Sequence, residues 1–238
     1  MILYRIYQLL IAAPILLLLT IITALTTTIG CTLGNASFWS YYPGMLWSRA
    51  MIRILLLPVH VEGKENMQEG QSYVIVANHQ GAFDIFLIYG FIGRHFKWVM
   101  KSSLRNIPLV GRACEAADFI FIDNHPARIK ESQARARRIL QGGVSVVVFP
   151  EGKRTWTGEM NPFKRGAFQM ADELQLPVLP VTINGSFKVL PRKHDIYFVN
   201  RHRLSLTIHA PIPPKGQGAE AERATMEEAY NVIKAGLE

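Results

Sequence analysis

The sequence predicts an α/β domain, with a mixed and mostly parallel sheet flanked by helices, that follows an N-terminal hydrophobic helical anchor. Two observations predict this. Short apolar runs rich in β-branched residues alternate with helix-like segments from Val59 onward. Before that point, no charged residue lies between Arg5 and Arg49. We therefore divide the 238 residues into an anchor, 1–58, and a domain, 59–238, that is long enough to bury one sizeable core.

The anchor contains a segment with the length and hydropathy of a membrane-embedded helix, Leu9 to Ile29, in which Pro14 is expected to produce a kink. The stretch from Asn35 to Trp47 has the Trp and Tyr content of a bilayer interface, and a second apolar run, Met51 to Val59, follows it. Two topologies fit this pattern: a helical hairpin within one leaflet, or one spanning helix followed by an interfacial helix. Either one places the chain at a membrane.

A cleaved signal peptide is the competing interpretation of this region, because Ile29 to Cys31 loosely resembles a lipoprotein cleavage site. Cleavage would leave the aromatic stretch and the second apolar run unexplained. Arg49 and Arg53 follow the hydrophobic segment, and the tendency of basic residues to stay inside places the domain on the cytoplasmic side. We expect the membrane to be a bacterial inner membrane.

The domain contains six candidate strands and two clear helices. The helices are Ala127 to Gln141, which starts beside a proline and ends before two glycines, and a closing surface helix, Glu220 to Gly236. The first has an apolar stripe of Ile129, Ala136, Ile139 and Leu140. The strands are Tyr73 to Ala77, Lys97 to Met100, Phe119 to Ile122, Ser145 to Phe149, Val178 to Thr182 and Leu204 to Ile208.

The chain is basic, with 26 Lys and Arg against 18 Asp and Glu, a net charge of +8. This excess favours an anionic partner: nucleic acid, a phosphate-bearing ligand or anionic lipid. The sequence has no run of basic residues interleaved with aromatic ones, and it has no zinc-finger spacing. We therefore expect no nucleic acid partner. Two cysteines are compatible with a reducing compartment.

Polar residues follow the first strand directly, in the stretch ANHQGAFD, and place His79 and Asp84 five residues apart. On one continuous helix these two side chains would point about 140° apart, so a pair needs a turn, and Gly81 can make one. Asp84 would then fix the imidazole tautomer and leave the other nitrogen free to remove a proton. The alternative is that Asp84 only caps the following helix and that His79 is an ordinary loop histidine. A metal site lacks a third ligand at suitable spacing.

A second polar cluster follows the strand at Ser145, in the stretch FPEGKRTWTG, and contains Glu151, Gly152, Arg154 and Thr155. The glycine permits close backbone approach, while the cations and the threonine hydroxyl can hold an anionic oxygen. The spacing is not that of a Walker A loop. A charged surface turn is the alternative for this stretch taken alone.

Nucleophile motifs are absent from the sequence: the segment around Ser145 lacks the second glycine of a nucleophile elbow, and Cys114 lies in a probable helix. A base without an internal nucleophile implies that the nucleophile arrives with the substrate. A hydroxyl-bearing, phosphate-bearing lipid would use the base, the cations and the anchor together.

These residues resemble the glycerolipid acyltransferase family, typified by 1-acyl-sn-glycerol-3-phosphate acyltransferases. NHQGAFD resembles the family's N-H-x4-D block and FPEGKRT its F-P-E-G-x-R-[ST] block; GKEN at Gly63 to Asn66, LPV at Leu179 to Val181 and FKRGAF at Phe163 to Phe168 agree with it. The resemblance runs from about Val59 to Asn184.

The resemblance implies that His79, oriented by Asp84, is the general base on the sn-2 hydroxyl of lysophosphatidic acid. That hydroxyl attacks the thioester of acyl-CoA or acyl carrier protein and gives phosphatidic acid. Glu151, Gly152, Arg154 and Thr155 would shape the acceptor site, with Arg154 on the phosphate. Since a thioester is already activated, the resemblance implies no cofactor, metal or ATP. Backbone N–H groups would stabilise the oxyanion.

One departure concerns the family's second block, which has a basic residue where this chain has Asn124. Lys101 and Arg128 are candidates to supply that charge at the acceptor phosphate. The uncharged Asn leaves other acceptors open: glycerol-3-phosphate, another lysophospholipid or a lyso-aminolipid. A non-catalytic membrane lipid-binding protein is the rival from another class, and a phospholipid hydrolase would need a nucleophile that the sequence lacks.

Overall fold

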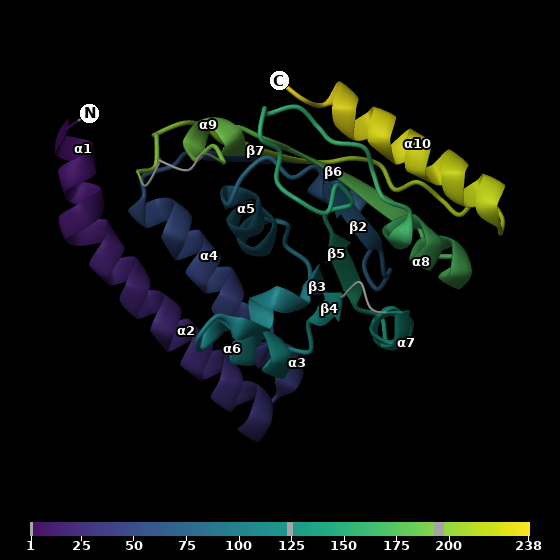
Figure 1. Ribbon diagram of the computed structural model, residues 1–238, viewed down its shortest axis with the longest axis horizontal. Coiled ribbons are helices and arrows are strands. Elements are labelled where there is room, and N and C mark those ends of the chain that lie inside the picture. Colours follow the sequence, from purple (N-terminus) through teal and green to yellow (C-terminus); the bar gives the residue numbers. More distant parts are fainter. Residues whose placement is uncertain (1, 123–125, 193–197) are drawn as a thin grey trace.

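The computed structural model describes residues 2–122, 126–192 and 198–238, and only the backbone of residues 126–130. Its centre is a seven-stranded sheet in the order β1-β7-β6-β2-β5-β3-β4 (Figure 1). All neighbouring strands are parallel except β6 and β7, which are antiparallel. The strands are β1 Val59–Glu62, β2 Val74–Ala77, β3 Phe96–Lys101, β4 Ile120–Ile122, β5 Ser145–Val148, β6 Val178–Asn184 and β7 Leu204–Ile208.

The predicted fold class is confirmed, and all six candidate strands are present within two residues of their predicted ends. Strand β1, Val59–Glu62, was not predicted from the sequence; only its first residue, Val59, was included, as the end of the apolar run that starts at Met51. This strand lies at the edge of the sheet and alternates partly buried with exposed residues, His60 and Glu62 being exposed. A four-residue strand with two polar positions has little apolar signal of its own.

Helices cover both faces of the sheet (Figure 1). On one face lies α5, Phe83–Phe91, beneath the N-terminal helices. On the other lie α7, Pro126–Gln141, α8, Gly166–Leu174, and α10, Ala219–Ala235. Shorter helices connect them: the 3-10 helices η2 Lys64–Asn66 and η3 Ser102–Asn106, and the α-helices α6 Val110–Ala116 and α9 Ser186–Val189.

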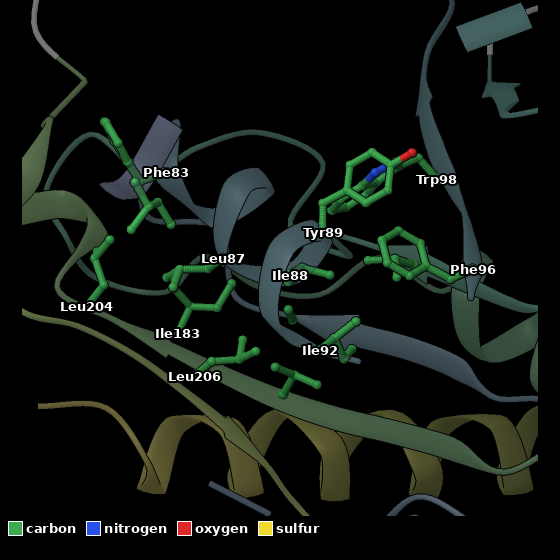
Figure 2. Close-up of a cluster of buried hydrophobic side chains, with 14 of the residues drawn as sticks. Phe83, Leu87, Ile88, Tyr89, Ile92, Phe96, Trp98, Ile183, Leu204 and Leu206 are labelled. Atoms are coloured by element: carbon green, nitrogen blue, oxygen red, sulfur yellow. The ribbon is translucent and has the colours of Figure 1, made fainter. Parts of the chain in front are cut away.

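Helix α5 forms the centre of the first core. Leu87, Ile88 and Ile92 are completely buried and face Ile183 and Leu206 of the sheet (Figure 2). Burying a side chain of this size stabilises the fold by about 1.5–3 kcal/mol. The helix is apolar on nearly all sides because it lies between the sheet and the N-terminal helices, as expected for a fully enclosed helix.

The second core confirms most of the stripe predicted for α7. Ala136, Ile139 and Leu140 are buried against the sheet. The side chain of Ile129 lies outside the described residues. Two of the basic residues on this helix are paired, Arg135 with Asp118 and Arg137 with Glu173.

The N-terminal segment forms one continuous helix, Ile2–Leu33, from α1 Ile2–Tyr7, the π-helical turn η1 Gln8–Ala12 and α2 Ala13–Leu33. Pro14 stands at the start of α2, directly after the π turn. Because proline lacks an N–H and crowds the preceding turn, a widened turn accommodates it without ending the helix. Two further helices, α3 Ala36–Trp39 and α4 Tyr42–Ile54, follow it.

Helix α4 returns along the long helix and ties it to the domain (Figure 1). Near the N-terminus, the hydroxyl of Tyr7 donates to the carbonyl of Ile54 at 2.7 Å. The amide of Gln8 makes two hydrogen bonds of 2.8 Å with the backbone of Val199. Near the other end, Trp47 Nε1 donates to Thr20 Oγ1 at 2.9 Å. The anchor residues Ile52 and Leu55 belong to the same core as α5.

The outward side of this hairpin is apolar. The long helix is apolar enough and long enough to cross a membrane. Large exposed apolar side chains cover its outer side: Ile2, Leu3, Ile6, Leu9, Leu10, Ile11, Ile15, Leu17, Leu18, Ile22, Leu25, Ile29 and Leu33. An exposed apolar surface of this extent is typical of a surface that binds a membrane.

Candidate active site

Both predicted polar clusters lie at the carboxyl edge of the parallel strands. β2 and β5 are parallel neighbours with Val76 level with Val148, and β3 lies on the other side of β5. His79 follows β2, the loop that starts at Phe149 follows β5, and Lys101 ends β3. Carboxyl ends of adjacent parallel strands meet at one edge, where open α/β sheets bind their ligands.

His79 and Asp84 form a hydrogen-bonded pair. Nδ1 of His79 lies 2.8 Å from Oδ2 of Asp84, and the same oxygen accepts a hydrogen bond of 2.8 Å from the amide of Gly81. Asp84 is completely buried in the first turn of α5, and the His79 side chain is 14% exposed. Because an ionised carboxylate only accepts hydrogen bonds, the pair places the ring proton on Nδ1 and leaves a lone pair on Nε2.

The turn between these two residues is closely packed against α9. A Cβ atom on Gly81 would lie 2.5 Å from the hydroxyl oxygen of Ser186 and 2.8 Å from its carbonyl oxygen. Contacts this short do not occur, so only glycine fits here without movement. The predicted role of Gly81 as the turn residue thus has a packing cause in addition to its conformational freedom.

The second cluster holds the backbone of His79 from both sides. The amide of His79 donates to Oε1 of Glu151 at 2.6 Å, and the amide of Thr155 donates to the carbonyl of His79 at 3.0 Å. The other carboxylate oxygen of Glu151 accepts two bonds of 2.7 Å from Asn161. Burial raises the pKa of Glu151, while these donors oppose the rise. Glu151 therefore joins the backbone of His79 to that of Asn161, one through each of its oxygens.

The His79 ring is also stacked. It lies nearly parallel to Phe149, with ring centroids 3.9 Å apart and planes at 9°, and Phe149 stacks in turn on Trp98 at 5.7 Å. The carboxylate thus fixes the edge of the imidazole and the phenyl ring fixes its plane. Together they leave the imidazole little rotational freedom.

The predicted acceptor-site residues take different positions. Thr155 is buried, and its hydroxyl accepts bonds from the amides of Thr157 and Gly158, which closes the loop. Gly152 has a left-handed φ of 71°, which favours glycine. Arg154 is half-buried, and its guanidinium has no ion-pair partner among the described residues. Lys101 is exposed at the end of β3.

Asn124 and the side chain of Arg128 lie outside the described residues. Of the two cations considered as replacements for the missing basic residue, the structure therefore places Lys101 only. Within the described part of the chain, no group of three or more His, Cys, Asp or Glu residues is arranged to hold a metal ion.

Four residues that support His79 or its loop were not predicted from the sequence: Asn161, Ser186, Phe149 and Asn78. Asn161 and Ser186 contact the site from outside the two motifs, and Phe149 lies within one but carried no predicted role. Asn78 is also buried, and its amide makes two bonds with the backbone of Ile183, which fixes β2 against β6. The position of Asn78, just before His79 in an apolar strand end, was the one available signal.

Comparison with known families agrees with this geometry. A family model described as Acyltransferase matches residues 58–184, which include the pair and the loop that holds it. The chain belongs to the acyltransferase family. This result confirms the resemblance that the two sequence blocks indicated.

Curated relatives of this acyltransferase occur in plants and mammals. It is 30% identical over 175 residues to a chloroplastic 1-acyl-sn-glycerol-3-phosphate acyltransferase of Brassica napus, covering 73% of this chain and 49% of the relative. It is 33% identical over 160 residues to 1-acyl-sn-glycerol-3-phosphate acyltransferase alpha of Ovis aries, covering 66% and 55%. The chain spans about half the length of these curated relatives.

A solved structure is similar over nearly the whole chain. The crystal structure of a 1-acyl-sn-glycerophosphate acyltransferase from Thermotoga maritima has a TM-score of 0.66 and 28% identity, and the match covers 92% of this acyltransferase and 93% of that chain. The likeness therefore includes the fold of the sheet and most of the N-terminal helices.

Proposed function

We propose that this acyltransferase transfers an acyl group from acyl-CoA or acyl carrier protein to the sn-2 hydroxyl of lysophosphatidic acid, giving phosphatidic acid. The observation that carries this proposal is the pair of His79 and Asp84. It supplies a general base whose Nε2 makes no hydrogen bond to a serine, threonine or cysteine among the described residues. The relatives from Brassica napus and Ovis aries and the similar structure from Thermotoga maritima are acyltransferases named for this acceptor, which supports the proposal.

The reaction follows from this geometry. Nε2 of His79 removes the proton of the acceptor hydroxyl, whose oxygen attacks the thioester carbonyl. Asp84 stabilises the imidazolium that forms. The new C–O bond gives a tetrahedral oxyanion; its collapse breaks the C–S bond, and the imidazolium gives its proton to the leaving thiolate. Because a thioester is already activated, the step requires no ATP, and we propose no cofactor or metal.

The charge of the loop supports a phosphate-bearing acceptor. Arg154 follows the segment that holds His79, and it is half-buried without a counter-ion among the described residues. A guanidinium in such a position is suited to bind a phosphate through two parallel hydrogen bonds. Lys101, at the end of a neighbouring strand, is the second cation that we assign to the acceptor site.

A lipid acceptor also gives the N-terminal hairpin a role. Its outward side is apolar, while its inner side packs on the domain through the Gln8–Val199 hydrogen bonds and through Ala12 and Leu16, which belong to the same core as α5. A helix fastened along its length to the domain favours a hairpin lying within one leaflet over a helix that crosses the bilayer alone. We propose that the domain lies on the cytoplasmic side of a bacterial inner membrane, in keeping with Arg49 and Arg53.

Thiol release from acyl-CoA tests the proposed function. Purified protein in detergent should release free CoA thiol when lysophosphatidic acid is added, and mass spectrometry should detect phosphatidic acid. His79→Ala should abolish both. His60→Ala, which removes an exposed histidine from the edge strand β1, is the matched control and should retain activity.

A panel of acceptors separates this function from its rivals. Turnover with glycerol-3-phosphate, another lysophospholipid or a lyso-aminolipid, but not with lysophosphatidic acid, would show the same chemistry on another acceptor. Lipid binding without turnover of any donor or acceptor would contradict the enzyme proposal and favour a lipid-binding protein. Undiminished turnover by His79→Ala would remove His79 from the mechanism.

A further inference from the structure

Arg192, which follows α9, contacts the loop that holds His79. Its Nη1 donates a hydrogen bond of 2.9 Å to the carbonyl of Arg154. Its guanidinium also lies over the ring of Trp156, with the central carbon 4.1 Å from the ring centroid. Neither the two sequence blocks nor their spacing indicated a residue so far along the chain.

One peptide unit connects Arg192 to His79. The unit that joins Arg154 to Thr155 is held at both ends: its C=O accepts from Arg192 and its N–H donates to the carbonyl of His79 at 3.0 Å. The guanidinium of Arg192 therefore lies beside Arg154, on the loop of the candidate active site. This position is fixed by two independent contacts, the carbonyl bond and the aromatic ring.

The charge around this loop is not neutralised. Lys153, Arg154 and Arg192 form no ion pair in the part of the chain that the structure describes. Of the two carboxylates within the loop, Glu151 directs both oxygens at His79 and Asn161, and Glu159 forms no ion pair in the described part of the chain. A group of cations without a counter-ion raises the local concentration of anionic ligands.

A guanidinium offers five N–H donors in a planar fork, and the Arg154 carbonyl uses one of Arg192's. The Arg192 guanidinium lies at the backbone of Arg154, and a fork whose plane is fixed by a carbonyl and a ring is suited to phosphate oxygens. Arg192 is half-buried, so part of its fork can still reach a ligand.

We propose that Arg192 binds a substrate phosphate together with Arg154 and so sets the preference of the enzyme for phosphate-bearing substrates. This inference rests on the proposed function. The phosphate has two sources, the phosphomonoester of the acceptor and the phosphates of the CoA donor.

Three variants separate the charge of Arg192 from its contact with the loop. Arg192→Gln removes the charge and keeps an N–H donor for the Arg154 carbonyl. Arg192→Lys keeps the charge without the planar fork, and Arg192→Ala removes both. Arg223→Gln is the matched control, because it removes the same charge from the exposed face of α10. Thermal unfolding of each variant shows whether it is folded.

Steady-state kinetics with paired substrates gives the test. We expect Arg192→Gln to raise KM for lysophosphatidic acid roughly 10- to 100-fold, as for the loss of a hydrogen bond to a charged group, and to leave KM for monoacylglycerol unchanged. KM of Arg192→Lys for lysophosphatidic acid should lie between the values of the wild type and Arg192→Gln. A rise in KM for acyl-CoA, with no rise for acyl-pantetheine, would support the proposal and assign the phosphate to the donor.

Two results would overturn the proposal. In the first, Arg192→Gln matches the wild type while Arg192→Ala lowers kcat for all acceptors, so that Arg192 only holds the loop. In the second, all variants lose activity equally with monoacylglycerol and lysophosphatidic acid.

A binding measurement separates this inference from the proposed function. Calorimetry with a lysophosphatidic acid analogue that lacks the sn-2 hydroxyl does not depend on turnover. If the wild-type protein shows no turnover and Arg192→Gln still weakens binding of the analogue, the phosphate site is supported and the proposed reaction is rejected. If the protein turns over and Arg192→Gln changes neither the binding of this analogue nor KM for acyl-CoA, the phosphate site alone is rejected.

Discussion

Oδ2 of Asp84 lies 2.8 Å from Nδ1 of His79, and the carboxylate that makes this contact is completely buried in the first turn of α5. The same oxygen accepts a hydrogen bond of 2.8 Å from the amide of Gly81. Asp84 therefore also fixes the turn that brings its own side chain to His79. The hydrogen bonds of the Asp84 carboxylate go to His79 and to the amide of Gly81, which precedes α5, and none goes to an amide in the first turn of that helix. Its position is explained by the histidine.

Asp84→Asn should lower kcat by roughly 10²- to 10⁴-fold, the usual contribution of a positioned general base. The amide side chain keeps a bond to the Gly81 N–H, but it can also donate to Nδ1 and so favour the wrong tautomer of His79. Thiol release with lysophosphatidic acid measures kcat, and thermal unfolding controls for stability. A variant within a few-fold of wild-type kcat would show that Asp84 does not orient the base.

Gly81→Ala should destabilise the fold by about 1–3 kcal/mol, because its Cβ would clash with Ser186. Chemical denaturation measures the loss. Adding Ser186→Ala removes the hydroxyl at 2.5 Å but leaves the carbonyl at 2.8 Å, so the double variant should recover only part of the stability. Recovery to the wild-type value, or no loss in the single variant, would contradict this packing.

Phe149→Leu should lower kcat several-fold with a smaller change in stability, since an aromatic pair contributes about 0.5–1.5 kcal/mol beyond its buried area. The expected cause is greater freedom of the His79 ring, which stacks on Phe149 at 3.9 Å. Phe163→Leu, which removes a stack on the other face of the sheet, is the control for lost aromatic area. Equal loss of kcat in both variants would count against a specific role for the stack.

The free energy of unfolding should fall as the pH falls through the ordinary histidine pKa of 6.5, because burial lowers the pKa of His209. With a lowered pKa, the folded protein binds the proton more weakly than the unfolded chain. The contribution of His209 to stability is thus complete above the ordinary histidine pKa. It is lost as the pH falls from that value toward the lower pKa of His209 in the folded protein.

His209→Gln should reduce this acid slope between about pH 7.5 and about pH 5.5 in chemical denaturation. Burial and the charge of Lys97 also lower the pKa of His95, so a part of the slope should persist in the single variant. An unchanged slope in the double variant of His95 and His209 would reject the assignment.

Two adjacent leucines test the membrane surface of the N-terminal helix. Leu17 is 65% exposed and Leu16 is buried. Leu17→Glu should weaken sedimentation with anionic phospholipid vesicles and leave thermal stability unchanged, whereas Leu16→Glu should lower the unfolding temperature, because a charge is costly to bury. Vesicle binding by Leu17→Glu equal to that of the wild type would place the membrane surface elsewhere.

Much of the sheet could be predicted because β2, β5 and β6 are fully enclosed. Their residues are mostly apolar, as in Val74–Ala77, and polar residues follow where β2 ends. The edge strand Val59–Glu62 was missed because half of it faces solvent. Likewise, the candidate base His79 was predicted because it follows an enclosed strand.

By itself the sequence determined the fold class, the apolar anchor and the two blocks that contain the candidate base and the proposed anion-binding loop, since these depend on residues that are neighbours in the chain. Only the tertiary structure decided how the blocks act on each other. Glu151 and His79 are 72 residues apart, and Arg192 is 38 residues from Arg154, yet each pair shares a hydrogen bond. The parallel order of β6, β2 and β5 brings these segments to one edge. Strand order is set by packing in three dimensions, which local sequence does not encode.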